Sequence, residues 1–199
     1  KAKEKSPTKS GDAGGAQAAK TSGKVESSAI GGNIVFKLSV GENPTVLYFY
    51  PGVGYGTQPY VNKVIKGMGV GNNTIIILAK KNSTPFSSLK ATAQKALAGS
   101  TPGDTRLGGW SGGAVGLSSA LKSGDSFSRV IYADPSPGSL IGKSHGNAKM
   151  YYNPKNWKGS LKHLGTKQEK LAAEMGGSAK LVGSDHNKIL KDSLSELLA

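Results

Sequence analysis

The stretch "RLGGWSGGAVGLSSAL", residues 106–121, decides what kind of protein this chain can be. Its first serine, Ser111, has two glycines before Trp110 and two directly after the serine itself, and small and apolar residues follow. Residues 109–113 fit the pattern G-x-S-x-G, which is typical of a sharp turn that presents one hydroxyl. The chain has 29 glycines, so such a pattern arises easily by chance, and a second copy exists around Ser144. The context of each copy must therefore distinguish them.

A turn that presents a nucleophile needs a strand before the serine, a helix after it, and small neighbours that avoid clashes. Ser111 follows the strand-like "TRLGGW" and precedes "GGAVGLSSALK", which can form a helix packed closely on a sheet. Ser144 precedes the strand-like "NAKMYY" instead. We therefore predict that Ser111 is the presented serine and that Ser144 lies in a loop. The alternative is that Ser111 lies in an ordinary glycine-rich turn.

The rest of the chain alternates between two patterns. Short β-branched or aromatic runs, which end in Gly, Pro or Asp, predict strands at residues 33–40, 45–52, 74–81, 105–110, 129–135, 148–154 and 179–185. Apolar residues at helical spacing predict helices at residues 58–68, 87–98, 112–122, 167–175 and 188–199. This alternation predicts an α/β domain with a mostly parallel sheet flanked by helices.

The order of these elements resembles that of the α/β-hydrolases over residues 33–199. The shared order is a strand with a glycine-rich end, a helix, a strand, a helix, the serine turn and three further strands. The resemblance implies a compact α/β-hydrolase fold, here without a large lid, and a catalytic set in the chain order Ser, acid, His. It also implies acyl transfer through a covalent serine intermediate, which needs no metal or organic cofactor.

Three histidines follow Ser111, namely His145, His163 and His186. His186 lies between the last predicted strand and the C-terminal helix, where this family carries its base. His145 belongs to the second Gly-Ser motif, and His163 lies in the lysine-rich "KGSLKHLG". We predict that His186 is the base. The alternative is that it is an ordinary polar residue in the first turn of a helix.

The acid is harder to assign. Many hydrolases carry it after the second strand beyond the serine, but that strand is followed here by Asn153 and Asn156. The preceding strand ends in Asp134-Pro135-Ser136-Pro137, which resembles the acid segment of pancreatic-type lipases. We predict Asp134 as the acid, with Asn153, no acid at all, or an ordinary Asp-Pro turn as alternatives. Asp185 is expected to cap the following helix.

Two backbone N–H groups should stabilise the oxyanion of an acyl-transfer reaction. Gly112, directly after the serine, is predicted to supply one, and Val53 or Gly54 in the loop "GVGYG" the other. The same loop also resembles a dinucleotide-binding turn, and Lys80 and Lys81 follow the next strand. Thr57, however, occupies the place of the third glycine in that motif.

Composition indicates the partners. The net charge is +14, and residues 1–32 hold only six lysines and three acids, so most of this charge belongs to residues 33–199. Such a field favours an anionic polymer or a bacterial envelope surface, although a solvated lysine surface is the plainer interpretation. Residues 1–32 have almost no large apolar side chain and predict a linker or arm. The chain has no cysteine and no apolar run long enough to span a membrane.

We therefore expect a serine esterase or lipase-like hydrolase that acts on an acyl ester. A second prediction is a hydrolase-fold domain, catalytic or not, of a larger assembly such as a phage tail, joined to it through residues 1–32. This would favour an extracellular or virion-associated location. A third is a binding module without catalysis.

Overall fold

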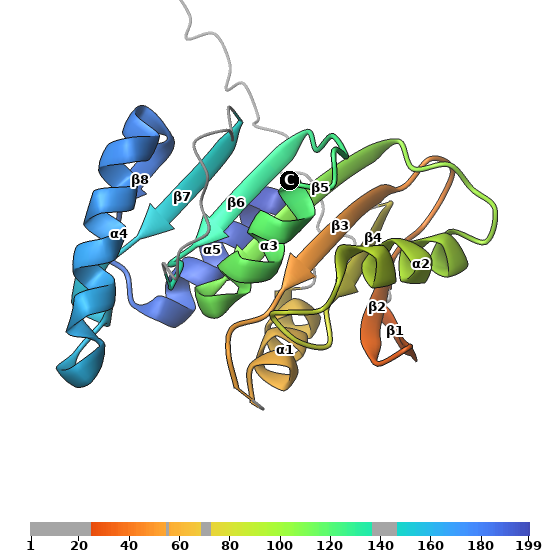
Figure 1. Cartoon of the computed structure of the whole chain (residues 1–199). Helices are drawn as coiled ribbons and strands as arrows, with labels where there is room; N and C mark the ends of the chain where they lie inside the picture. The colour runs from red at the N-terminus through yellow and green to blue at the C-terminus, as the bar shows by residue number, and fades with distance from the viewer. Residues whose placement is uncertain (1–24, 55, 69–72, 137–146) are drawn as a thin grey trace, which may run out of the picture.

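A computed structural model describes residues 25–54, 56–68, 73–136 and 147–199, which form one eight-stranded sheet with helices on both faces (Figure 1). The strands are β1 (Val25–Ile30), β2 (Asn33–Leu38), β3 (Thr45–Tyr50), β4 (Thr74–Leu78), β5 (Asp104–Trp110), β6 (Arg129–Ala133), β7 (Ala148–Tyr152) and β8 (Ala179–Leu181). The helices are α1 (Thr57–Met68), α2 (Phe86–Leu97), α3 (Ala114–Leu121), α4 (Lys162–Met175) and α5 (His186–Leu198).

The strand order is β1-β2-β4-β3-β5-β6-β7-β8. From β4 to β8 all neighbouring strands are parallel, whereas β2 runs antiparallel to both β1 and β4. The predicted α/β class with a mostly parallel sheet is confirmed. Every residue of β4 is buried, as expected for a parallel strand covered on both faces.

Two apolar layers hold the helices to the sheet. Helices α2, α3 and α4 pack on one face through side chains that include Leu89, Leu117 and Leu171. Helices α1 and α5 pack on the other face through residues that include Ile65 and Leu194. Figure 1 shows α3 in front of the sheet and α5 behind it. The carboxyl ends of the parallel strands meet at one edge, where ligand sites form in open α/β sheets.

The predicted arm ends earlier than Gly32. Residues 25–30 form β1 and pair with β2 along the whole strand, from Val25 opposite Leu38 to Ile30 opposite Asn33. Composition concealed this strand because its four middle residues are exposed and only the two end residues are partly buried. Residues 1–24 lie outside the described part of the chain, so the linker they were predicted to form stays a prediction.

Helix α4 begins at Lys162, earlier than the residue 167 that periodicity indicated. Gly165 interrupts the pattern because the helix comes very close to the segment after β7 at this point. A Cβ on Gly165 would lie only 2.7 Å from the carbonyl oxygen of Pro154. Within the described ranges, no helix has the length and apolar character that crossing a membrane requires. Ser144 and His145 lie outside those ranges.

Candidate active site

Ser111 lies in a sharp turn between β5 and α3. It is the first residue of a short 3-10 segment, Ser111–Gly113, and its φ is +54°. A side chain in this left-handed region costs roughly 1–2 kcal/mol, so the surrounding structure must hold it there. The strand before Ser111 and the helix after it are both present, as the G-x-S-x-G context predicted.

The glycines around Ser111 are required by close packing. A Cβ on Gly113 would collide with the carbonyl oxygen of Tyr50 and lie 2.7 Å from that of Pro51. A Cβ on Gly109 would lie 2.9 Å from the carbonyl oxygen of Gly113. Since backbone atoms cannot move aside cheaply, the turn and the start of α3 can approach β3 only with glycine at these positions.

Asp134 and His186 are joined by a hydrogen bond. Asp134 directly follows β6 with a φ of +42°, and its side chain is fully buried. His186 is the first residue of α5, and its side chain is 30% exposed. The Nδ1 nitrogen of His186 lies 2.6 Å from Oδ2 of Asp134. Asp185, as predicted, caps α5 by accepting hydrogen bonds from the first backbone N–H groups of the helix.

Asn153, the alternative acid position, supports Asp134 instead of replacing it. Its backbone N–H donates to Oδ1 of Asp134 at 3.0 Å, and its side-chain amide donates to the carbonyl oxygen of Ser184 at 2.9 Å. The imidazole of His186 is therefore bonded to a carboxylate rather than to this amide. His163, at the start of α4, is exposed and contacts the carbonyl oxygen of Ser160.

Two further side chains, which sequence reasoning did not assign to the site, also bond Asp134. Asn156 donates to Oδ2 at 2.8 Å, and the buried Gln168 of α4 donates to Oδ1 at 2.9 Å. Burial by itself raises the pKa of Asp134, but the hydrogen bonds from His186, Asn156, the Asn153 N–H and Gln168 outweigh it and lower the pKa below its usual value. Asp134 is therefore held as a carboxylate.

The imidazole of His186 contacts the rings of two tryptophans. The centre of the His186 ring is 4.7 Å from the ring centre of Trp110, the residue before Ser111, and 5.4 Å from the ring centre of Trp157. The indole N–H of Trp110 also donates to the carbonyl oxygen of His186 at 3.2 Å. The Nε2 nitrogen makes no hydrogen bond to any described residue. These contacts bring the start of α5 against the serine turn.

The loop after β3 lies beside the serine turn. A Cβ placed on Gly52 would be 3.3 Å from Cβ of Ser111, and one placed on Gly112 would be 3.2 Å from the backbone nitrogen of Val53. The hydroxyl of Thr57 donates to the carbonyl oxygens of Gly52 and Gly54 at 2.9 Å each and so fixes the loop. The predicted oxyanion residues Gly112 and Val53 are thus neighbours, and Gly54, with a φ of +109°, continues the turn.

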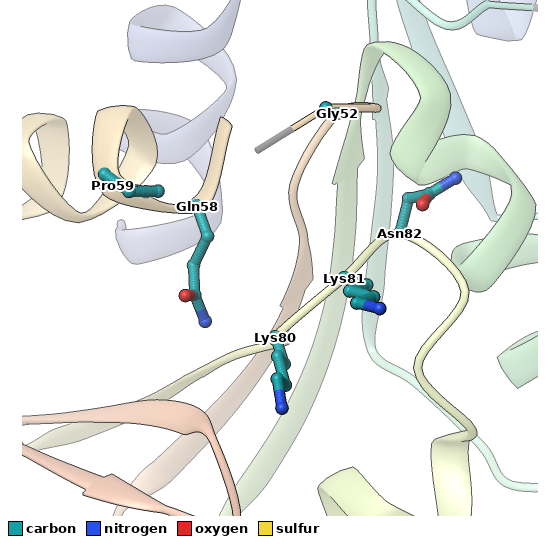
Figure 2. Close-up of a pocket in the computed structure, with 7 residues that line it drawn as sticks. Gly52, Gln58, Pro59, Lys80, Lys81 and Asn82 are labelled. Carbon is teal, nitrogen blue, oxygen red and sulfur yellow. The ribbon is translucent and has the colours of Figure 1, made fainter. Parts of the chain in front are cut away.

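Gly52 and Gly54 of this loop also line a pocket of about 550 Å³. We call it the lysine pocket, and its lining residues are Gly52, Gly54, Gln58, Pro59, Lys80, Lys81 and Asn82. Figure 2 shows Gln58 extending from α1 toward the segment after β4 that carries both lysines. The side-chain amide of Asn82 donates to the carbonyl oxygen of Gly112 at 3.3 Å, so this segment also contacts the serine turn.

Solved structures with the same fold are enzymes. A lidless α/β serine hydrolase from Xanthomonas campestris is 13% identical, with a TM-score of 0.54 over 89% of this chain and 92% of that one. Poly(aspartic acid) hydrolase-1 from Sphingomonas sp. KT-1 is 14% identical, with a TM-score of 0.56 over 87% of this chain and 98% of that one. The capsule O-acetyltransferase of Neisseria meningitidis serogroup A is 14% identical, with a TM-score of 0.50 over 87% and 94%.

No protein-family model matches the sequence, and no curated protein sequence matches it significantly. At these identities the structural likeness shows the fold. The chain has the α/β-hydrolase fold, as the order of its elements predicted.

Proposed function

Starting from the α/β-hydrolase fold of this chain, we propose that the protein is a serine hydrolase that cleaves an ester or related acyl bond through an acyl-enzyme on Ser111. The observation that carries this proposal is the 2.6 Å hydrogen bond between buried Asp134 and His186. That bond orients an imidazole at the sheet edge where Ser111 is held in a left-handed turn. A carboxylate on Nδ1 leaves Nε2 as the nitrogen that accepts the serine proton.

The chemistry then follows in two halves. The Ser111 hydroxyl oxygen attacks the substrate carbonyl carbon while Nε2 of His186 takes its proton, and Asp134 stabilises the resulting imidazolium. The backbone N–H groups of Gly112 and of Val53 or Gly54 donate to the oxyanion. When the tetrahedral intermediate collapses, its bond to the alcohol breaks and His186 returns the proton to that alcohol. Water repeats the same steps on the acyl-enzyme and releases the acid.

An acyl-enzyme can also pass its acyl group to an alcohol in place of water. The likeness to an acetyltransferase supports this variant as well as hydrolysis, because both reactions share the first half. The predicted association with an envelope or a larger assembly stays a prediction, which the net charge of +14 and residues 1–24 motivate.

The test compares two serine substitutions in the G-x-S-x-G copies. Ser111→Ala should abolish turnover of a small activated ester such as 4-nitrophenyl acetate, because the half-buried hydroxyl supplies the nucleophile and little packing. Ser144→Ala should keep the turnover of the native protein. Thermal unfolding of both variants checks that the fold is intact. Loss of turnover in Ser144→Ala, with Ser111→Ala still active, would reverse the assignment.

A further inference from the structure

The lysine pocket lies at the same level of the sheet as Ser111. Strand β3 lies between β5 and β4 in the sheet. If the register of the β3–β5 pair is continued past the strand ends, Gly52 lies opposite Ser111, and the register of the β3–β4 pair likewise places Lys81 opposite Gly52. The close approach of Gly52 to Ser111 agrees with this alignment. The residue after Lys81 reaches the serine turn, since the side-chain amide of Asn82 donates to the carbonyl oxygen of Gly112 at 3.3 Å. A substrate held at Ser111 can therefore extend over Gly52 to the lysines.

The backbone that carries the two lysines is fixed. The N–H of Lys80 donates at 2.9 Å to the side-chain oxygen of Asn33, which is buried and itself donates to Thr92. The N–H of Lys81 donates at 2.9 Å to the hydroxyl of Thr84. The pocket floor is thus built before any ligand arrives.

The two ammonium groups are left without a counter-charge. Both lysines are exposed, and, like most described lysines, neither forms an ion pair with a described residue. The other residues lining the pocket are glycine, proline or amide side chains, and none is acidic. Two adjacent like charges in a concave site favour the binding of an anion.

The side chain of Lys80 lies close to Gly32 in the β1–β2 turn. The φ of Gly32 is +82°, and a Cβ there would lie 2.7 Å from Cδ of Lys80. The end of the Lys80 side chain therefore lies along the β1–β2 turn, since the same Cβ would also be 3.3 Å from Nζ. Gln58 ties the same turn to the end of β4 by donating to the carbonyl oxygens of Gly32 and Ala79.

We propose that the lysine pocket selects substrates in which the scissile ester is accompanied by a carboxylate group, held by Lys80 and Lys81 while Ser111 attacks the ester carbon. This proposal rests on the proposed hydrolase function and names its substrate class. The substrates are half-esters of dicarboxylic acids, or esters whose alcohol or phenol leaving group carries a carboxylate.

The experiment uses two matched substrate pairs on the full chain. The acyl-side pair is 4-nitrophenyl hemiglutarate and neutral 4-nitrophenyl valerate, which differ mainly in the terminal charge. The leaving-group pair is 4-acetoxybenzoate and its methyl ester. We expect the native protein to prefer the charged member of at least one pair by about tenfold in kcat/KM, since each exposed ion pair contributes up to about fivefold. The pair that shows the preference identifies the side of the ester that faces the lysines.

The variants test whether the lysines cause that preference. Lys80→Met with Lys81→Met should abolish it while leaving kcat/KM for the neutral esters unchanged, and the corresponding double Arg variant should keep it. Lys122→Met with Lys170→Met removes the same net charge from exposed positions outside the pocket and should change neither value. Glutarate and inorganic phosphate are also tested as inhibitors of neutral-ester turnover. The anion that inhibits more strongly is the one the pocket prefers, and this inhibition should be lost in the double Met variant.

The outcomes separate this proposal from the proposed function. Turnover of the neutral esters that depends on Ser111, with no preference for either charged ester, would overturn the carboxylate pocket and leave the hydrolase standing. A preference that the Lys122/Lys170 control loses as well would assign it to overall charge and would also overturn the pocket. If no ester is turned over, the proposed function is wrong and the pocket proposal falls with it.

Discussion

The two sides of Ser111 differ in how their charged groups are paired. We call them the Asp134 flank, which holds Asp134 and His186, and the lysine flank, which holds Lys80 and Lys81. On one flank Asp134 is fully buried and accepts hydrogen bonds from four groups, among them His186 and Gln168. On the other flank Lys80 and Lys81 are exposed, and no described residue pairs with their charges. The Asp134 carboxylate finds its hydrogen-bond donors within the protein, whereas the two lysine ammonium groups have no carboxylate partner among the described residues.

In the proposed hydrolase, the Asp134 flank serves the chemistry and the lysine flank serves the selection of substrate. A group that must hold a proton on one atom has to be fixed in advance, because reorganisation during the reaction raises the barrier. A group that selects a substrate must stay accessible and lose its water only when the correct anion arrives. Changes on the Asp134 flank should therefore affect every substrate, and changes on the lysine flank only charged ones.

The largest effect is expected from Asp134→Asn. The amide cannot hold the Nδ1 proton of His186, so the wrong imidazole tautomer is favoured, and kcat should fall about ten-thousand-fold for neutral and charged esters alike. Asn also supplies one acceptor oxygen where the carboxylate supplies two, so some stability should be lost. Steady-state kinetics and thermal unfolding measure both effects.

Asp185→Asn is the matched control for that substitution. Asp185 precedes His186 and caps α5 without contacting the imidazole, and Asn caps helices equally well, so turnover should be unchanged. If Asp134→Asn remains folded and nearly fully active, Asp134 is only a turn residue and the two flanks do not differ as described.

The second effect concerns stability in acid. Hydrogen bonds lower the pKa of buried Asp134, so below about pH 4 the folded state binds fewer protons than the unfolded state, whose Asp pKa is about 3.9. This contribution to stability is complete above the unfolded pKa and is lost as the pH falls toward the folded pKa. The free energy of unfolding, measured by urea titration between pH 3 and pH 6, should therefore fall more steeply with acid in the native protein than in Asp134→Asn. Parallel curves would contradict a stabilised carboxylate.

The smallest effect is expected from salt. At about 1 M salt the screening length shrinks to roughly 3 Å, so the preference for the charged ester over its neutral partner should fall severalfold. Turnover of the neutral ester depends on the buried flank and should change much less. If salt lowers the turnover of the charged and the neutral ester equally, the lysine flank does not select the charged substrate, and the distinction between the flanks is wrong.

The main elements could be predicted because local patterns dictate them. The glycines around Ser111 have no space for a Cβ, and the buried strands β3 and β4 read as continuous apolar runs. His186 was indicated by the resemblance to α/β-hydrolases, which carry their base between the last strand and the C-terminal helix. Its hydrogen bond to Asp134, rather than to Asn153, agrees with the Asp-Pro segment as the favoured acid position.

Three other features could not be predicted, because they depend on contacts between residues that are far apart in the sequence. Gln168 reaches Asp134 because α4 packs against residues Pro154–Asn156 after β7, and its sequence neighbourhood is that of an ordinary polar helix position. Strand β1 has exposed middle residues and is fixed by pairing with β2. The sequence shows that Lys80 and Lys81 follow a strand, but it does not show that they lie near Ser111. That proximity follows from the order of β4, β3 and β5 in the sheet.

The most direct test of the central claim is covalent labelling of Ser111. A fluorophosphonate probe reacts with a serine only where a base and an oxyanion site activate it. Mass spectrometry of the digested protein should place one adduct on the peptide that contains Ser111, and Asp134→Asn should slow its formation strongly. An unlabelled protein, or an adduct on any other serine, would contradict the assignment of Ser111 as the nucleophile.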